Sequence, residues 1–469
     1  MKKYIGFLLL FLVPSYFIYA QNNSAIVGSW IGKLDLGSAK LTIVFHISEE
    51  EGKLQATMDS PDQGANGLAV EEVIYNKGQI KLNMPNINGG YEGDILVGDS
   101  TIEGKWNQAG QSWPLVLKKG DVPKPNRPQE PKAPYPYIEK EVKFENKEAG
   151  ITLAGTLTLP KLRQPVPAVI LITGSGGQNR DEELFFHKPF KVIADYLTRN
   201  GIAVLRFDDR GVAESEGSQT NATSEDFATD VSAAVDFLLQ QKNIIKDKVG
   251  LCGHSEGGMI APLTAINRDD IAFLILLAGP GTTGKQILLD QTELIYAKSG
   301  ARESLINDIL ETNSVVYKTL LKESDNDKAI KKIKKYIKKQ SKGYSESEKQ
   351  SRGWTQEMMD QNLNMITSPW FRYFIAYDPV PVLQQVKCPV LALNGSLDLQ
   401  VPAKQNLEGI EKALQDGGNN MITTKEFPEL NHLFQHSTTG LPGEYGQIEE
   451  TFSPEVLDYM TQWIVKLIK

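Results

Sequence analysis

The stretch "GLCGHSEGGM", Gly250–Met259, places a serine between two glycines where an apolar run ends and a helix-like run begins. The pattern G-x-S-x-G at a strand-to-helix turn is typical of a nucleophile elbow, which holds a serine in a strained conformation with its hydroxyl exposed. Side chains at Gly253 and Gly257 would clash with such a turn. We therefore expect Ser255 to be a nucleophile, the alternative being a tight turn that happens to contain a serine.

Strand-like and helix-like segments alternate on both sides of this turn. The apolar runs "VPAVILITG", "IAVLRFDD", "IAFLILLAG" and "CPVLALNGS" are typical of strands covered on both faces, and the segments between them are typical of helices. This alternation predicts a doubly wound, mostly parallel α/β sheet with right-handed crossovers over residues 138–469. Ser255 then stands at the end of the fifth strand.

The alternation stops over residues 284–377, which are highly charged and favour helix. We interpret this segment as a helical cap inserted between two strands of the sheet. Its stretch "KAIKKIKKYIKKQSK" carries isoleucines on one helical face and lysines elsewhere. Such a helix either docks through a narrow apolar stripe or lies on a membrane surface, and the flanking acidic residues favour docking.

Residues 24–119 have a different pattern. Short strand-like runs such as "KLTIVFHI" and "QIKLNM" are separated by turns rich in Gly, Asn and Asp. They predict a small all-β domain, either a barrel or a sandwich. Residues 120–137 contain many prolines, which favour an extended chain, and we interpret them as a linker between the two domains.

The first residues, "MKKYIGFLLLFLVPSYFIYAQNN", have the layout of a secretory signal peptide: two lysines, an apolar run and a small residue. We expect residues 1–20 to be removed after Ala20. The alternative is an uncleaved anchor, but Pro14 and Ser15 interrupt the apolar run. No cysteine follows the cut, so the sequence predicts a secreted or periplasmic protein that is not a lipoprotein and has no stable membrane anchor.

The overall composition excludes some classes of function. The chain has 469 residues and a formal net charge of −8 at pH 7, so it lacks the positive charge that attracts nucleic acid, and we expect no nucleic-acid partner. Its two cysteines and five histidines show no spacing typical of a zinc site. We therefore expect no metal site.

A serine hydroxyl needs a base, and the few histidines allow a choice by elimination. His46 lies in the all-β part, His187 at the start of a helix, and His254 inside the elbow, with its side chain expected to point away from the serine. His432 and His436 remain, in "ELNHLFQHS" after the last strand. We choose His432 because it comes first after the strand, and His436 is the alternative.

The base needs a carboxylate that fixes its tautomer. The stretch "LALNGSLDLQVP" supplies Asp398 in the loop after a buried strand. The chain order Ser255, Asp398, His432 is the order expected when a G-x-S-x-G serine begins a catalytic triad. The alternative is a solvated loop aspartate.

An acyl-transfer site also needs donors for the developing oxyanion. The backbone N–H of Glu256, the residue after the nucleophile, is the first candidate. The second is expected in "ITGSGGQNRDEE", whose glycines allow close approach of the backbone, and we choose Ser175, then Gly176. The rival interpretation, a phosphate-binding loop, lacks the G-x-G-x-x-G spacing and the P-loop lysine.

Two further groups of side chains are ambiguous. Charged residues after two of the strands either bind substrate or brace loops, and we favour bracing; they are Arg180, Asp181, Asp209 and Arg210. Aromatic residues in "SPWFRYF", near the end of the cap, either line a substrate pocket or pack the cap onto the sheet; they are Trp370, Phe371 and Phe374.

Residues from about 140 to 469 resemble the bacterial α/β-hydrolase superfamily, and most closely secreted carboxylesterases of the serine aminopeptidase-like or dienelactone-hydrolase-like type. The resemblance rests on five blocks in order: "TGSGGQNRDE", "FDDRGVAES", "GHSEGG", "NGSLDLQVP" and "NHLFQ". It implies an α/β-hydrolase fold and no cofactor. It also implies a catalytic triad formed by Ser255, Asp398 and His432. The oxyanion hole would be formed at Ser175 and Glu256.

The sheet order of that family also bears on the thiols. It places Cys252 near the end of the fifth strand and Cys388 near the start of the seventh, with one strand between them. Neighbouring strands are about 4.8 Å apart, and a disulfide requires Cα atoms within about 7 Å. We therefore expect two free thiols.

The leading hypothesis is an exported serine hydrolase that cleaves carboxylic esters of small molecules through an acyl-enzyme. A serine peptidase or aminopeptidase with the same triad, acting on short peptides, is the second hypothesis. The third is a binding protein that keeps the fold without the chemistry.

Overall fold

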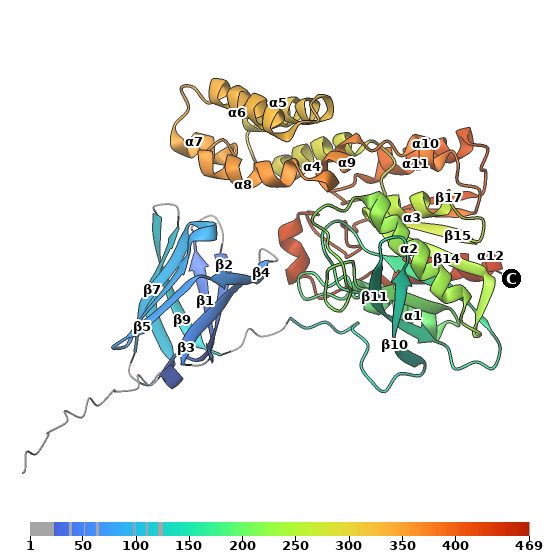
Figure 1. The fold of residues 1–469 in the computed structure, drawn as a ribbon, viewed down its shortest axis with the longest axis horizontal. Helices are drawn as coiled ribbons and strands as arrows, with labels where there is room; N and C mark the ends of the chain where they lie inside the picture. Colours follow the sequence, from blue (N-terminus) through green and yellow to red (C-terminus); the bar gives the residue numbers. More distant parts are fainter. Residues whose placement is uncertain are drawn as a thin grey trace, which may run out of the picture. The chain divides into compact units, whose positions relative to one another are not determined.

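The computed structural model describes residues 23–468 except 37–39, 51, 62–64, 97, 99, 109–110 and 121–124. The chain divides into two compact units, Met1–Pro123 and Lys124–Lys469, and each is described by itself (Figure 1). The signal peptide predicted over residues 1–20 lies outside the described residues.

The described part of the first unit is an antiparallel sheet of nine strands in the order β4-β3-β2-β1-β9-β8-β7-β6-β5. Residues of β3 contact β5 and residues of β4 contact β6, so the sheet curls until its two edges meet. Large side chains fill its interior, among them Trp30, Phe45, Tyr91 and Trp106. The all-β prediction is confirmed.

The elements of this unit are η1 (Asn23–Ala25), β1 (Gly28–Asp35), β2 (Lys40–Glu50), β3 (Lys53–Ser60), β4 (Ala65–Val70), β5 (Glu72–Asn76), β6 (Gln79–Met84), η3 (Pro85–Ile87), β7 (Gly89–Ile95), β8 (Thr101–Gln108) and β9 (Gln111–Lys119).

The described residues of the second unit form an eight-stranded sheet in the order β10-β11-β13-β12-β14-β15-β16-β17. The first two pairings, β10 with β11 and β11 with β13, are antiparallel, and the remaining pairs are parallel. This is the doubly wound, mostly parallel sheet that the alternating pattern predicts. The strands are β10 (Ile138–Asn146), β11 (Ile151–Leu159), β12 (Val166–Ile172), β13 (Ala203–Phe207), β14 (Ile244–His254), β15 (Phe273–Leu277), β16 (Val390–Gly395) and β17 (Ile422–Phe427).

Helices cover both faces of this sheet, because successive side chains of a strand point to opposite faces. On β12, Ala168 and Ile170 pack with α2, α3 and α11, whereas Val169 and Leu171 pack with α1 and α12. These elements, with the two short helices near them, are α1 (Pro189–Arg199), α2 (Ser224–Leu239), α3 (Gly257–Ala265), α10 (Val380–Leu383), α11 (Ala403–Asp416), η4 (Pro442–Gln447) and α12 (Pro454–Ile468).

The segment predicted as a cap, residues 284–377, lies in the chain between β15 and β16 and consists of helices joined by short connections, coloured yellow to orange in Figure 1. It contains α4 (Gly284–Lys298), α5 (Glu303–Lys322), α6 (Asn326–Gln340), α7 (Glu346–Ser351), α8 (Gln356–Ile366) and α9 (Pro369–Ala376). On the lysine-rich helix α6, Ile333 and Ile337 are buried in the core of the cap, so packing within the cap covers its apolar stripe. Among the described residues, no helix is both long and apolar enough to cross a membrane.

Part of the proline-rich segment predicted as a linker is attached to the second unit. The guanidinium of Arg127 donates to the backbone carbonyls of Phe185, Phe186, Gly446 and Ile448. One side chain therefore satisfies carbonyl groups of two loops, and it fixes the segment that follows Lys124 to this unit.

The two cysteines are free. One lies in β14 and the other just before β16, and β15 separates these two strands in the sheet. Cys252 is buried in β14, and Cys388 directly precedes Pro389 and β16. Burial raises the pKa of the Cys388 thiol to about 11 and raises that of Cys252 further. Both thiols are therefore poor nucleophiles at neutral pH.

Candidate active site

The serine of the G-x-S-x-G stretch stands in the turn between β14 and α3. Ser255 has φ of +54°, in the left-handed region that residues with a side chain rarely adopt. Its N–H donates to the carbonyl of Leu277 at the end of β15, at 2.8 Å. A Cβ atom on Gly253 would lie 2.0 Å from the carbonyl oxygen of Gly257, and one on Gly257 would lie 2.3 Å from that of Ile172. The two glycines are therefore a steric requirement of the turn.

The predicted acid and base come together in the loops after β16 and β17. The Nδ1 atom of His432 lies 2.8 Å from Oδ2 of Asp398, and the aspartate side chain is fully buried. The other carboxylate oxygen of Asp398 accepts the N–H groups of Gln400 and Val401, each at 2.8 Å. Three donors thus hold the carboxylate, which in turn orients the imidazole.

The other candidate base, His436, is placed elsewhere. Its side chain is half exposed and pairs with Glu450 at 2.8 Å. His187 is buried, with its nitrogens 2.9 Å from the Thr451 hydroxyl and from the carbonyl of Tyr445, and burial lowers its pKa to about 4. The structure therefore brings His432 to Asp398, and it uses His187 to join loops.

Ser255 and His432 line one pocket with a volume of about 350 Å³. Residues of the cap, of the β12 loop and of the C-terminal loops form its largely apolar wall: Leu184, Phe185, Ile287, Leu288, Trp370, Phe374, Val401, Leu433, Pro442 and Tyr445. Among the described residues that line it, none is a lysine or an arginine.

The three cap aromatics separate into two groups. Trp370 and Phe374 are one helical turn apart, stack with ring centroids 5.6 Å apart, and line the pocket. Phe371 points to another side of α9 and packs in the cap core against Tyr317, with ring centroids 5.9 Å apart. Helical geometry therefore gives Phe371 a packing role, the alternative that the sequence left open.

The glycine-rich loop after β12 passes beside the serine. A Cβ atom on Gly174 would lie 3.2 Å from Cβ of Ser255, and the N–H of Gly174 donates to Oε1 of Glu182 at 3.1 Å. Of the two oxyanion candidates in this loop, Ser175 lines the pocket, and Gly176 follows at φ of +91°. The amide of Gly174 is already engaged with Glu182, and of the two candidates only Ser175 is among the described residues that line the pocket.

The side chain of Glu256, next to the serine, links three parts of the unit. Its Oε1 atom accepts the hydroxyl of Ser224 at the start of α2, at 2.6 Å, and the indole N–H of Trp370, at 2.9 Å. Burial raises the pKa of this carboxyl, although those hydrogen bonds oppose the shift. The residue whose backbone amide is the predicted oxyanion donor is thus tied to the cap.

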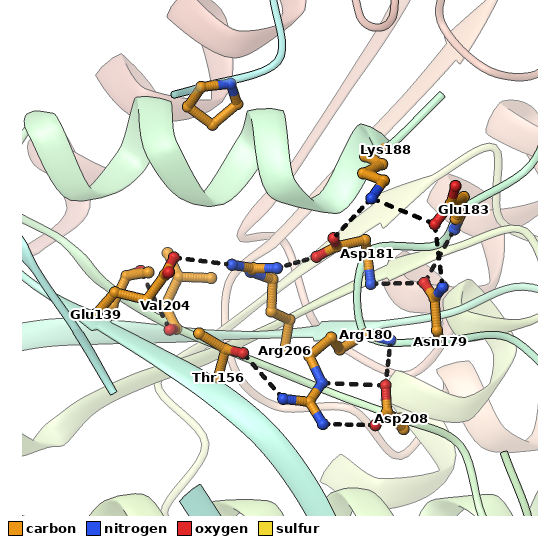
Figure 2. A network of polar contacts seen from close by, with 12 residues as sticks. Glu139, Thr156, Asn179, Arg180, Asp181, Glu183, Lys188, Val204, Arg206 and Asp208 are labelled. Carbon is orange, nitrogen blue, oxygen red and sulfur yellow. Dashed lines mark hydrogen bonds and ion pairs between the residues drawn. The ribbon is translucent and has the colours of Figure 1, made fainter. Parts of the chain in front are cut away.

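The charged loop residues brace the structure, as favoured from the sequence. Figure 2 shows Arg180 bound to Asp208, and Arg206 of β13 bound to Asp181. Arg210 pairs with buried Asp230 at 2.7 Å. These ion pairs hold the loops after β12 and β13, and charge-assisted hydrogen bonds of this kind are the strong ones.

Asp209 also holds a loop. Its carboxylate accepts the Thr173 hydroxyl at 2.7 Å and the Gln178 N–H at 2.9 Å, and burial raises its pKa to about 7. Among the described residues, no three His, Cys, Asp or Glu side chains are grouped as they would be around a metal ion.

Sequence reasoning missed several residues of the site. Phe185 and Tyr445 line the pocket from irregular loops, where no periodicity indicates which side chains turn inward. Glu182 and His254 form a buried pair beside the predicted triad, with 2.9 Å between Oε1 and Nδ1. A histidine next to the nucleophile and an acidic "DEE" run were visible signals, but nothing in the sequence connects them.

Comparisons with known proteins agree with this arrangement. A family model described as "Serine aminopeptidase, S33" matches residues 188–360, which include the nucleophile turn and most of the cap. The esterase EstD of Thermotoga maritima is 25% identical over 337 residues, which cover 70% of this chain and 69% of that protein.

Solved structures with similar folds include the α/β hydrolase GrgF from a Penicillium species and the Pyrococcus furiosus esterase Pf2001. GrgF has a TM-score of 0.43 and 16% identity, and the match covers 70% of this chain and 98% of GrgF. Pf2001 also has a TM-score of 0.43 and 16% identity, with coverage of 75% and 100%.

The sheet order, the serine turn and the two sequence matches together define the class: the chain is an α/β-hydrolase. More narrowly, it is a serine hydrolase of the esterase-like type.

The tightness of the serine turn gives a direct prediction. Gly253→Ala forces a Cβ atom into the space that the Gly257 carbonyl occupies, so we expect hydrolase activity to fall by roughly a hundredfold or more and the thermal midpoint to drop. Gly443→Ala is the matched control, because its new Cβ would meet nothing within 4 Å. Equal activity of the two variants, measured with an activated ester, would show that the turn does not need its glycines.

Proposed function

We propose that this protein is an exported carboxylesterase that forms an acyl-enzyme on Ser255. The observation that carries the proposal is the 2.8 Å contact between His432 Nδ1 and Asp398 Oδ2, beside a pocket that Ser255 and His432 both line. A buried carboxylate at that distance holds the proton on Nδ1 and leaves Nε2 free to act as a base.

In the proposed mechanism, His432 takes the proton of the Ser255 hydroxyl as the oxygen attacks the ester carbonyl. The carbonyl oxygen becomes an oxyanion, which the backbone amides of Glu256 and Ser175 stabilise. His432 then gives its proton to the leaving alcohol. Water repeats the sequence, with His432 again as the base, and releases the carboxylic acid.

The pocket supports an uncharged, largely apolar ester as the substrate. Aromatic and aliphatic side chains form most of its described lining, which has no lysine or arginine that would hold an anionic group. Its two carboxylates, Glu182 and Glu256, are already hydrogen-bonded to protein groups. The similar protein from Thermotoga maritima is named an esterase, which supports ester over peptide hydrolysis. Because the matching family model is named a serine aminopeptidase, removal of an N-terminal amino acid from a peptide is the competing reaction.

The proposed chemistry is tested with p-nitrophenyl acetate, butyrate and octanoate beside the p-nitroanilide of an amino acid. We expect the wild type to cleave the esters faster than the anilide, and Ser255→Ala to lose roughly 10⁴-fold or more in kcat. His436→Gln serves as the control and should retain full activity. Faster cleavage of the anilide would favour the peptidase, and activity that survives Ser255→Ala would refute the proposed nucleophile.

The apolar wall predicts a change of chain-length preference. Phe374→Ala enlarges the pocket, so the ratio of kcat/KM for octanoate to that for butyrate should rise roughly tenfold, as expected for a few extra buried methylene groups. Phe371→Ala removes the same ring from the cap core and should lower stability without changing that ratio. A ratio that Phe374→Ala leaves unchanged would mean that the acyl chain lies elsewhere.

Export is supported by the lysines, the apolar run and Ala20 at the N-terminus. The full-length chain, expressed in a bacterium with a periplasm, should yield a mature protein that begins at Gln21. Mass spectrometry of the intact protein and of its N-terminal peptide identifies this residue, whether as glutamine or as pyroglutamate. A protein that retains Met1 and stays in the cytoplasm would exclude the export proposal.

A further inference from the structure

His254, the residue before Ser255, is held at both ring nitrogens by hydrogen-bond acceptors. Its side chain is buried, with only 8% exposed. Nδ1 lies 2.9 Å from the carboxylate oxygen Oε1 of Glu182, and Nε2 lies 3.0 Å from the backbone carbonyl oxygen of His432. The second contact joins the turn that carries the nucleophile to the loop that carries the proposed base.

The chemistry of imidazole determines how many protons this arrangement needs. A neutral imidazole has one N–H donor and one nitrogen lone pair, but a carboxylate and a carbonyl oxygen both accept. A neutral ring beside an ionised Glu182 would therefore turn a lone pair toward one of the two oxygens. An extra proton, shared between Glu182 and Nδ1, removes this conflict and leaves Nε2–H to donate to the carbonyl of His432.

Glu182 is itself held in place. Its Oε1 atom also accepts the N–H of Gly174, in the loop that passes beside Ser255. Its backbone has φ of +51°, and its neighbours Asp181 and Glu183 both interact with Lys188, as Figure 2 shows. A braced carboxylate in the interior thus connects the oxyanion loop, through His254, with the base loop.

We propose that Glu182 and His254 form a protonated positioning pair, which fixes the backbone of the His432 loop through the Nε2–H bond to its carbonyl. This inference rests on the proposed function of His432 as the general base. The pair would act mainly on kcat, because it aligns the base; both side chains border the pocket, but they are only 8% and 2% exposed and offer substrate little surface. Neither residue is a member of the triad.

The charges around the pair predict its pH dependence. Glu182, His432 and Asp398 face His254, and together they raise its pKa above the ordinary 6.5 despite burial. A group whose pKa is raised by folding stabilises the fold fully when the pH is below its pKa in the unfolded chain. This contribution is lost as the pH rises through its pKa in the folded protein. Activity should therefore fall on the alkaline side when the pair loses its proton. Asp209 also lies near Glu182, and burial raises the pKa of its carboxyl to about 7.

Asparagine and glutamine separate the two contacts of His254. The amide nitrogen of His254→Asn takes the place of Nδ1, so this variant keeps the bond to Glu182 and loses the donor to His432. We expect its kcat to fall roughly a hundredfold with little change in KM. The double variant Glu182→Gln/His254→Gln keeps a donor near the position of Nε2 and has no buried charge. It should stay within about tenfold of the wild type and lose the alkaline decline in kcat.

His436→Gln, at a half-exposed histidine paired with Glu450, is the control for replacing a histidine and should behave as the wild type. A kcat of His254→Asn equal to that of the wild type, or an alkaline decline that persists in the double variant, would overturn the proposal.

A spectroscopic test needs neither activity nor a folded His254 variant. In ¹⁵N-histidine-labelled Ser255→Ala, five histidines give a simple spectrum, and His254 should show protons on both nitrogens at pH 7.5. A nitrogen of His254 that carries no proton and titrates near 6.5 would overturn the pair. If His254 is doubly protonated while Ser255→Ala retains full esterase activity, the proposed nucleophile fails and the pair stands.

Discussion

The close contact of two backbones at the serine turn is the constraint on which the site depends. A Cβ atom on Gly253 would overlap the carbonyl oxygen of Gly257, and a Cβ atom on Gly257 would overlap the carbonyl oxygen of Ile172. Only this approach lets β14 turn directly into α3 and leaves Ser255 in the left-handed region. The N-terminus of α3 then points at the serine, where a partial positive charge favours a developing anion. The proposed acid, base and oxyanion loop follow β16, β17 and β12, at the carboxyl ends of parallel strands of the same sheet.

Buried carboxylates surround this turn, and most of them position loops. Glu256 ties the residue after the serine to the cap, and Asp209 holds the start of the glycine-rich loop. Burial raises the pKa of both, which is the cost of placing acids in a medium of low dielectric. Donors from Ser224, Trp370 and Thr173 offset part of that cost. The site therefore gains rigidity from groups outside the proposed triad.

Much of this arrangement could be predicted from the sequence, because it depends on short-range pattern. Alternating apolar runs and helices specify a parallel sheet, and the carboxyl ends of its strands lie at one edge. Asp398 and His432 each follow such a strand, and the structure brings them within hydrogen-bond distance. The charged break in the alternation likewise marked the cap.

The remaining features depend on how elements dock, which the pattern does not encode. Phe371 and Phe374 are the same type of residue on the same helix. Only the orientation of α9 places Phe371 in the cap core and Phe374 at the pocket. Tyr445 reaches the pocket from a loop without periodicity. Glu182 and His254 lie 72 residues apart, and a buried pair of that separation leaves no mark in the sequence.

The central claim, that His432 activates Ser255 as a nucleophile, is tested most directly by labelling with a fluorophosphonate and locating the adduct by tandem mass spectrometry. A single adduct on Ser255 is expected, formed roughly a hundredfold or more slowly in His432→Gln. An adduct on another residue, no adduct at all, or an unchanged labelling rate in His432→Gln would contradict it.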